Sequence, residues 1–188
     1  MIGVGITPAI WKPGDSGPDP VSATDSATRR EDMMFTQDVL SDKIHTGEDG
    51  TYKYIGAVYF PAGVVPQTLS TMSTITAATF KLTCKSGSGT CSIDIKADVD
   101  EPVPSSNSDF DSAEYEDNVN HSVAYPGDDA QITINVKDLI EHILETEELD
   151  TDSTITLYLF DDTTGSPHWE FDNPTDSGDV APTLLIDP

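Results

Sequence analysis

The chain has 188 residues and carries 34 acidic residues against 9 basic ones, so its formal charge is −25 at pH 7. This balance argues against direct binding to nucleic acid, because phosphate contacts require cations on the protein surface. No apolar run approaches the roughly 20 residues needed to span a bilayer, so no membrane association is expected. The opening residues lack the pattern of a secretory signal, which predicts synthesis in the cytoplasm.

The leading part of the chain has the composition of an extended segment. Residues 1–32 are rich in Pro, Gly, Asp and Ser, which disfavour a helix or a long strand. The segment also contains apolar side chains that need burial, and among these Ile6, Ile10 and Trp11 are the candidate partner-binding residues. We interpret residues 1–32 as an arm that docks on its own domain or on a neighbouring molecule, the alternative being a loose terminus.

Residues 33–188 show the pattern of short strands separated by Gly, Pro and Asp turns. Alternation of apolar and polar residues is typical of a sheet with one solvated face. The predicted strands are Tyr54–Phe60, Ile75–Cys84, Ser92–Val99, Gln131–Val136, Thr154–Phe160 and Thr183–Ile186. This pattern predicts an all-β sandwich or barrel.

Two segments depart from the strand pattern. Apolar residues between 136 and 146 follow helical spacing, which predicts one short amphipathic helix over about 137–146. Residues 100–130 show no periodicity, and irregular loops of this length are usually functional or disordered. We therefore expect this loop to make contacts outside the protein.

The acidic charge is concentrated in the second half of the chain. Residues 97–188 carry 24 acidic residues and one basic residue, Lys137. One interpretation is a solvated acidic face suited to salty water; the other is that carboxylates hold Ca²⁺, which takes roughly 6–8 oxygen ligands. The candidate calcium ligands are Asp98, Asp100 and Glu101, although no acidic run matches an EF-hand loop.

The two cysteines, Cys84 and Cys91, flank the glycine-rich stretch of residues 85–90. This stretch is typical of a hairpin turn, which would place the cysteines opposite each other. A disulfide there would add about 2 kcal/mol or less to the free energy of unfolding. Synthesis in a reducing compartment favours free thiols packed in the hairpin, with oxidation after release from the cell as the other option.

The order of these segments resembles a known family. The run from Ile75 to Leu82, ITAATFKL, is similar to the I-x-s-A-x-L-x-L strand of DNRLRE-type domains, which resemble carbohydrate-binding modules. The run INVKDLI, residues 134–140, stands where that family has a D-V-T-x-x-V segment, and residues 169–172 and 181–186 match its closing strands loosely. The resemblance covers residues 50–188 and implies a jelly-roll β-sandwich.

Domains of this kind also recur in the virions of tailed phages, which gives the main functional expectation. The resemblance implies a non-enzymatic decoration or cement protein on the virion surface, made in the host cytoplasm. Its partners would be the major capsid protein or other virion subunits, and it would form a homo-oligomer such as a trimer. The sequence carries no G-x-S-x-G elbow, H-E-x-x-H motif or phosphate-binding loop, so we expect no catalysis and no cofactor besides the candidate calcium.

The alternative function is that of a carbohydrate-binding domain. Such a domain would recognise glycans through aromatic side chains in its loops, on which sugar rings stack. The candidate glycan-binding residues are Tyr115, Tyr125, His168 and Trp169. For Trp169 the competing interpretation is a structural residue half-buried at the rim of the sandwich.

Overall fold

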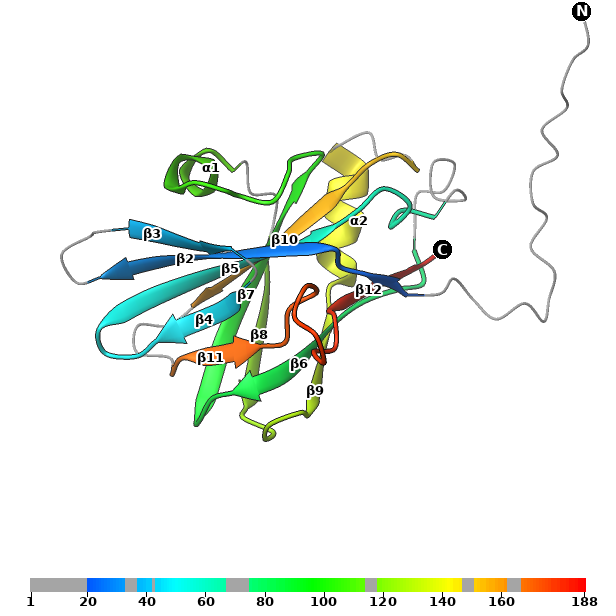
Figure 1. The fold of residues 1–188 in the computed structure, drawn as a ribbon. Helices are drawn as coiled ribbons and strands as arrows, with labels where there is room; N and C mark the ends of the chain where they lie inside the picture. The colour runs from blue at the N-terminus through cyan, green and yellow to red at the C-terminus, as the bar shows by residue number, and fades with distance from the viewer. Residues whose placement is uncertain are drawn as a thin grey trace, which may run out of the picture.

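A computed structural model describes residues 20–32, 37–41, 43–66, 75–113, 118–146, 151–161 and 167–188. In these residues antiparallel strands form two packed layers, with two short helices at the periphery (Figure 1). The predicted all-β sandwich is confirmed.

The strands are divided unequally between the two layers. The first layer has the order β1 (Val21–Ser22), β12 (Thr183–Asp187), β6 (Ala77–Ser86), β9 (Gln131–Asn135). The second has the order β3 (Gln37–Ser41), β2 (Asp25–Asp32), β5 (Tyr52–Phe60), β10 (Ile155–Asp161), β7 (Thr90–Val99), β8 (Asn118–Ala124). Two short strands, β4 (Ile44–Glu48) and β11 (Trp169–Phe171), join the layers, because β4 pairs with β5 and with β11, and β11 pairs with β6.

The main core lies between the layers and follows the predicted alternation. On β7 the side chains of Ile93 and Ile95 are fully buried, as are those of Leu157 and Leu159 on β10. The helix α2 (Lys137–Thr146) covers one end of this core, burying the apolar side chains of one face, and it has the bounds that the sequence predicts. Its first backbone N–H donates to Asn135 Oδ1 at 3.0 Å, which satisfies one of the unpaired donors at a helix start.

A second, smaller apolar cluster lies on the outer face of the second layer. It contains Ala27, Ala57, Tyr158 and Phe110, and the last comes from the short helix α1 (Asn107–Ser112). A capping box between Ser106 and Asp109 starts this helix. The expectation of an irregular loop over residues 100–130 is therefore wrong, because this stretch contains α1 and β8.

The predicted boundary of the leading arm at residue 32 is also wrong. Strands β1 and β2 both fall before it, and β2 pairs along its length with β5 and with β3. The sequence conceals β2 because this strand buries Ser26 and Thr28 where a typical strand buries Val or Ile. Residues 1–19, with the candidates Ile6, Ile10 and Trp11, lie outside the described residues.

The glycine-rich stretch of residues 85–90 crosses from one layer to the other and makes no hairpin. Strand β6 before it belongs to the first layer and β7 after it to the second. Cys84 and Cys91 are buried in the main core as free thiols, the state that the sequence analysis favours, but the predicted hairpin between them is not formed. Burial raises the pKa of the Cys84 thiol to about 11 and that of the Cys91 thiol to about 12, which keeps both protonated and unreactive.

Candidate functional site

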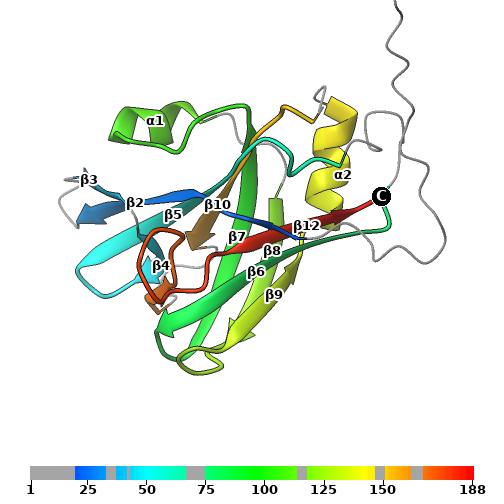
Figure 2. The ribbon, with the colours of Figure 1, turned by 45° about the vertical axis from the view of Figure 1, so that its right-hand side comes forward.

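The leading residues enter the fold at the edge of the first layer. Val21 pairs with Leu184 of β12, and the Ala23 N–H donates to the Pro182 carbonyl at 2.8 Å. Pro20, the first described residue, is exposed. Figures 1 and 2 place the C-terminus and α2 at one end of the sandwich. The entry point is therefore at the protein surface, beside the C-terminal strand.

Trp169, the main candidate for glycan stacking, is a core residue. Its side chain is fully buried, and its Nε1–H donates to the Ser88 carbonyl at 2.9 Å. The ring of Tyr125 meets it edge-on at a centroid distance of 5.1 Å, and a Cβ at Gly87 would lie 2.8 Å from Trp169 Cδ1. No face of this indole is open to a sugar, so the assignment of Trp169 to a glycan site is wrong.

The remaining glycan candidates are not brought together as a platform. Tyr125 is half-buried and donates its hydroxyl to Asp128 at 2.6 Å. His168 is half-buried in a ring stack with His45 and Tyr54, at centroid distances of 5.0 and 4.4 Å. Tyr115 lies outside the described residues.

The ring stack around His168 forms a polar cluster that sequence reasoning missed. His45 Nδ1 lies 2.7 Å from His168 Nε2, so one nitrogen donates to the other. Burial lowers the pKa of His45 to about 4, and the charges of His168, Lys43 and Lys85 act in the same direction. Burial also lowers the pKa of His168. Both imidazoles are therefore neutral at pH 7.

The buried surroundings of His45 indicate which of the two facing ring nitrogens carries the proton of this hydrogen bond. His45 Nε2 is buried and has no hydrogen-bond partner. Buried N–H groups without partners are rarer in proteins than buried acceptors without partners. We therefore place the proton on His45 Nδ1, which donates it to His168 Nε2.

An Asp-Gly turn positions this cluster. Asp49 Oδ1 accepts the Thr51 and Tyr52 N–H groups at 2.8 Å each, while Asp49 Oδ2 accepts the Tyr54 hydroxyl at 2.8 Å. Against the effect of burial, these hydrogen bonds lower the pKa of Asp49. Burial and Asp49 raise the pKa of Tyr54 to about 12. The dipeptide Asp49-Gly50 was the available sequence signal, because it is typical of a hairpin turn.

The three predicted calcium ligands have separate structural roles. Asp98 is buried on β7, and Asp100 accepts the Thr154 N–H at 2.8 Å. Glu101 is exposed, and its carbonyl accepts the Thr156 hydroxyl at 3.3 Å. Within the described ranges, no group of three or more His, Cys, Asp or Glu side chains is arranged to hold a metal ion.

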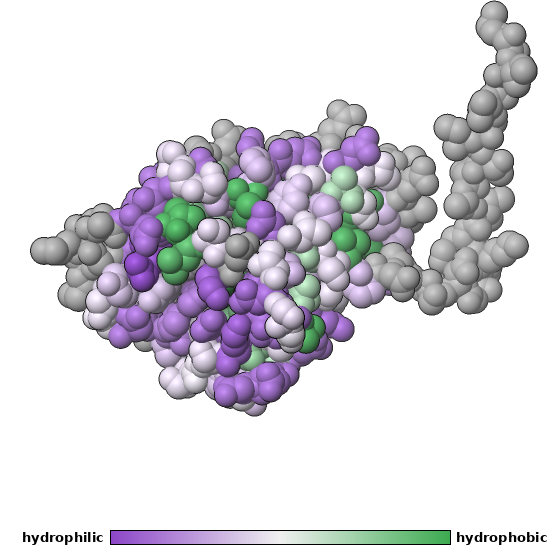
Figure 3. All heavy atoms as spheres, viewed as in Figure 1, coloured by the Kyte–Doolittle hydropathy of each residue, from purple (hydrophilic) through white to green (hydrophobic). Residues whose placement is uncertain are grey.

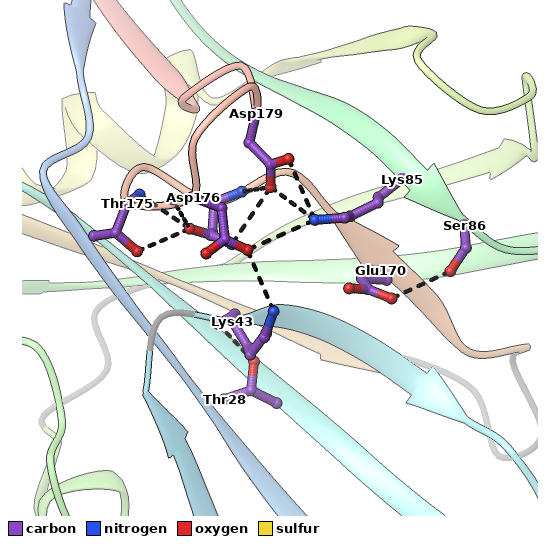
Figure 4. A network of polar contacts seen from close by, with 9 residues as sticks. Thr28, Lys43, Lys85, Ser86, Glu170, Thr175, Asp176 and Asp179 are labelled. Carbon is purple, nitrogen blue, oxygen red and sulfur yellow. Dashed lines mark hydrogen bonds and ion pairs between the residues drawn. The ribbon is translucent and has the colours of Figure 1, made fainter.

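A network of ion pairs fixes the loop that follows β11 (Figure 4). The Lys85 ammonium lies 2.9 Å from the Asp179 carboxylate and 3.7 Å from Asp176, which also pairs with Lys43 at 3.4 Å. Hydrogen bonding from Asn173 and pairing with Lys43 lower the pKa of Asp176. The cations that balance these carboxylates come from β6 and from the residue before β4, so the loop is tied to both layers.

The surface of the protein is strongly polar. Figure 3 shows hydrophilic residues over most of the face that carries β4 and β11, with apolar residues in small separate patches. Among the described large apolar residues only Val180 is exposed, at 49%.

The excess of negative charge predicts stabilisation by salt. Raising NaCl from about 0.01 M to about 1 M shortens the Debye length from roughly 30 to 3 Å, which screens repulsion among the carboxylates. We expect the melting temperature at pH 7 to rise by about 5 °C, as measured by scanning calorimetry. An unchanged or lower melting temperature would show that the exposed ion pairs outweigh this repulsion.

The comparisons with known proteins give no relative from which to infer a function. No protein-family model matches the chain, and no curated protein matches it. Neither helix in the described part of the chain is long and apolar enough to cross a membrane.

Proposed function

We propose that this protein is a non-enzymatic structural protein of a tailed-phage virion, namely a decoration or cement protein on the virion surface. It binds the shell through its leading residues and the edges of its sandwich. Its partners are the major capsid protein or other virion subunits, and further copies of the same chain, for instance in a trimer.

This proposal is carried by the place at which the leading residues enter the fold. They join at the surface of a sandwich that already has a buried core of its own. The main core consists of side chains between Ala23 and Ile186, and the chain enters it at a sheet edge from the exposed Pro20. Among the described large apolar residues only Val180 is exposed. The sandwich therefore offers little apolar surface against which Ile6, Ile10 and Trp11 could be buried. These side chains are therefore suited to burial against a partner.

The energetics favour such a segment as an anchor. Burying a large apolar side chain contributes about 1.5–3 kcal/mol, so three of them outweigh a moderate ordering cost. Proline lowers that cost because it restricts the unbound chain, and four prolines precede Val21.

Deleting residues 1–20 tests this role. The shortened chain should keep its melting temperature within about 2 °C, because the core residues all remain. Supplied in place of the full chain during infection, it should be absent from purified phage particles, as measured by mass spectrometry. Incorporation of the shortened chain at the level of the full chain, or absence of the full chain from the particles, would refute the proposal.

Single substitutions test whether apolar side chains of the leading segment, rather than the segment as a whole, bind the partner. Trp11→Ser should reduce incorporation strongly, because it removes the largest apolar side chain of the segment. Lys12→Ser at the next position is the matched control and should leave incorporation unchanged. Equal incorporation of the two variants would contradict an anchoring role for Trp11.

A further inference from the structure

Strand β9 is an edge of the first layer. Within the described ranges it pairs only with β6. On either side of it, the Val136 N–H donates to the Ala78 carbonyl at 3.0 Å, and the Cys84 N–H donates to the Ala130 carbonyl at 2.9 Å. The backbone groups of successive residues point to opposite sides of an antiparallel strand. The even-numbered residues of β9 therefore turn their N–H and C=O groups to β6, and the odd-numbered residues turn theirs away from the sheet.

This free side of β9 carries none of the features that commonly protect a strand edge. Protected edges have charged residues, prolines or bulges. Strand β9 has the sequence QITIN, and its register with β6 runs without a shift. Its outward residues Gln131 and Thr133 are exposed. In a chain with 34 acidic residues, this uncharged edge is open to pairing with a further strand.

The main core is incompletely covered beside this edge. Strand β8 is the edge of the second layer, and residues 125–130 join it to β9, so both edges lie on the same side of the sandwich (Figures 1 and 2). Val119 and Val123 of β8 pack against the main core but are only half-buried. A strand added beside β9 would cover these two side chains with apolar side chains of its own.

The leading residues contain a segment that matches this edge. Residues 2–6 have the sequence IGVGI, an uncharged run with the length of β9. As a strand, this run has Ile2, Val4 and Ile6 on one face and only glycines on the other. Glycine weakens a strand that stands alone, so the run is suited to pairing with an existing sheet edge.

We propose that residues 2–6 of one copy add as a strand to β9 of a second copy. The backbone of the added strand pairs with the outward groups of Gln131 and Thr133. Its three apolar side chains cover the margin of the core beside β8. This inference rests on the self-association included in the proposed function, and it names the two segments that meet.

The place at which the leading residues leave the fold favours a second copy as the acceptor. They leave at β1, which is the opposite edge of the layer from β9. To reach β9 of their own copy they would have to cross β12 and β6. Residues 7–20 supply 14 connecting residues, or about 43 Å at the roughly 3.1 Å per residue of an extended proline-rich segment, which reaches a neighbouring copy. Because donor and acceptor are opposite edges, the contact is head-to-tail, and a ring of copies closes it.

Disulfide cross-linking between single-cysteine variants tests the pairing. Gly3→Cys and Gly5→Cys each add a thiol on the glycine face of the segment, and Thr133→Cys adds one on the exposed face of β9. Thr133→Cys chains are mixed with chains of either glycine variant at about 1 M NaCl, which screens the repulsion between acidic copies, and are then oxidised. At least one mixture should give a disulfide-linked dimer with one chain of each kind, identified by mass spectrometry of the linked peptides.

Ser122→Cys is the matched control, because it adds an exposed thiol to β8, the neighbouring edge strand. It should remain unlinked to either glycine variant. The proposal is overturned if Thr133→Cys gives no mixed dimer, or if Ser122→Cys gives as much. A chain carrying both Gly5→Cys and Thr133→Cys distinguishes the two acceptors, since a disulfide within one chain as its main product would assign the strand to its own copy and would also overturn the proposal.

Sedimentation velocity of the free protein at the same salt concentration measures the strength of the association. The full chain should form species larger than the monomer, and Val4→Ser should raise the Kd about tenfold, because it removes one apolar side chain from the added strand. Lys12→Ser should keep the Kd of the full chain. A full chain that stays monomeric, or an unchanged Kd in Val4→Ser, would refute the pairing.

The cross-linking and the test on phage particles fail independently. Cross-linking uses free protein without a capsid. Normal cross-linking of a chain that is absent from the particles contradicts only the virion role. Incorporation into particles without cross-linking contradicts only the strand addition.

Discussion

Replacing Trp169 with alanine should lower the free energy of unfolding by about 4 kcal/mol, the largest effect expected of any substitution considered for this protein. The indole is fully buried between the layers and contacts the rings of Tyr125 and Phe171. Its removal leaves a cavity and leaves the Ser88 carbonyl without its donor. Urea denaturation followed by circular dichroism measures the loss.

Trp169→Phe is the control for this substitution. Phenylalanine keeps most of the apolar volume and loses the hydrogen bond, so we expect a smaller loss of about 1–2 kcal/mol. A loss below about 1 kcal/mol for Trp169→Ala would contradict the burial of this residue. It would also reopen the assignment of Trp169 to a ligand site.

Lowering the pH from about 6.5 to 4 should reduce the free energy of unfolding by about 2 kcal/mol, chiefly through His45. Its pKa is about 4 in the folded protein and about 6.5 in the unfolded chain, so in this window the unfolded chain binds the extra proton. The stability is fully present above pH 6.5 and is lost as the pH falls through the folded pKa. The lowered pKa of His168 acts in the same direction.

Several charged groups face His45 and His168 and affect how much free energy of unfolding is lost at acid pH. Lys43 and Lys85 oppose protonation of His45, whereas Asp49 and Glu170 favour protonation of His168. The expected loss in the free energy of unfolding, about 2 kcal/mol, is smaller than the loss for a fully buried imidazole, because His45 is only partly shielded from water. Urea denaturation at half-unit pH intervals measures the slope.

His45→Gln should flatten the dependence of stability on pH between 6.5 and 4, because it removes the main titrating group. His142→Gln on α2 removes a histidine outside the cluster and should keep the slope of the unmodified protein. If His45→Gln keeps the full slope, the loss at acid pH comes from another group.

Periodicity predicted the elements that bury one face against the main core. Strands β5, β6, β7, β9, β10 and β12, together with α2, all lie within about two residues of their predicted bounds. Strand β2 was missed because its contacts are polar: the Thr28 hydroxyl donates to the Lys43 carbonyl and accepts the His45 N–H. Strands β4 and β11 are too short to show a period.

The functional features could be predicted only in part. The burial of Trp169 depends on Gly87, which is far away in the sequence and packs against it only because residues 85–90 cross between the layers. The hollow lined by Arg29 of β2, Ile55 of β5 and Phe160 of β10 requires side chains from three strands, and their adjacency follows from sheet order, which a single sequence does not reveal. The acidic composition did indicate the charged surface, but not which carboxylates are paired.

The way the leading residues join the sheets determines how a tethered copy of this protein would resist force. Strand β1 holds only two residues, so a pull on the N-terminal side would detach it early. The tension would then pass to β2, whose eight residues pair with β5 and lie between β5 and β3. Hydrogen bonds in such a ladder lie across the direction of the chain, so a lengthwise pull loads many of them at once. A sandwich anchored by its leading residues would therefore unfold under such a pull only when the hydrogen bonds between β2 and β5 break together.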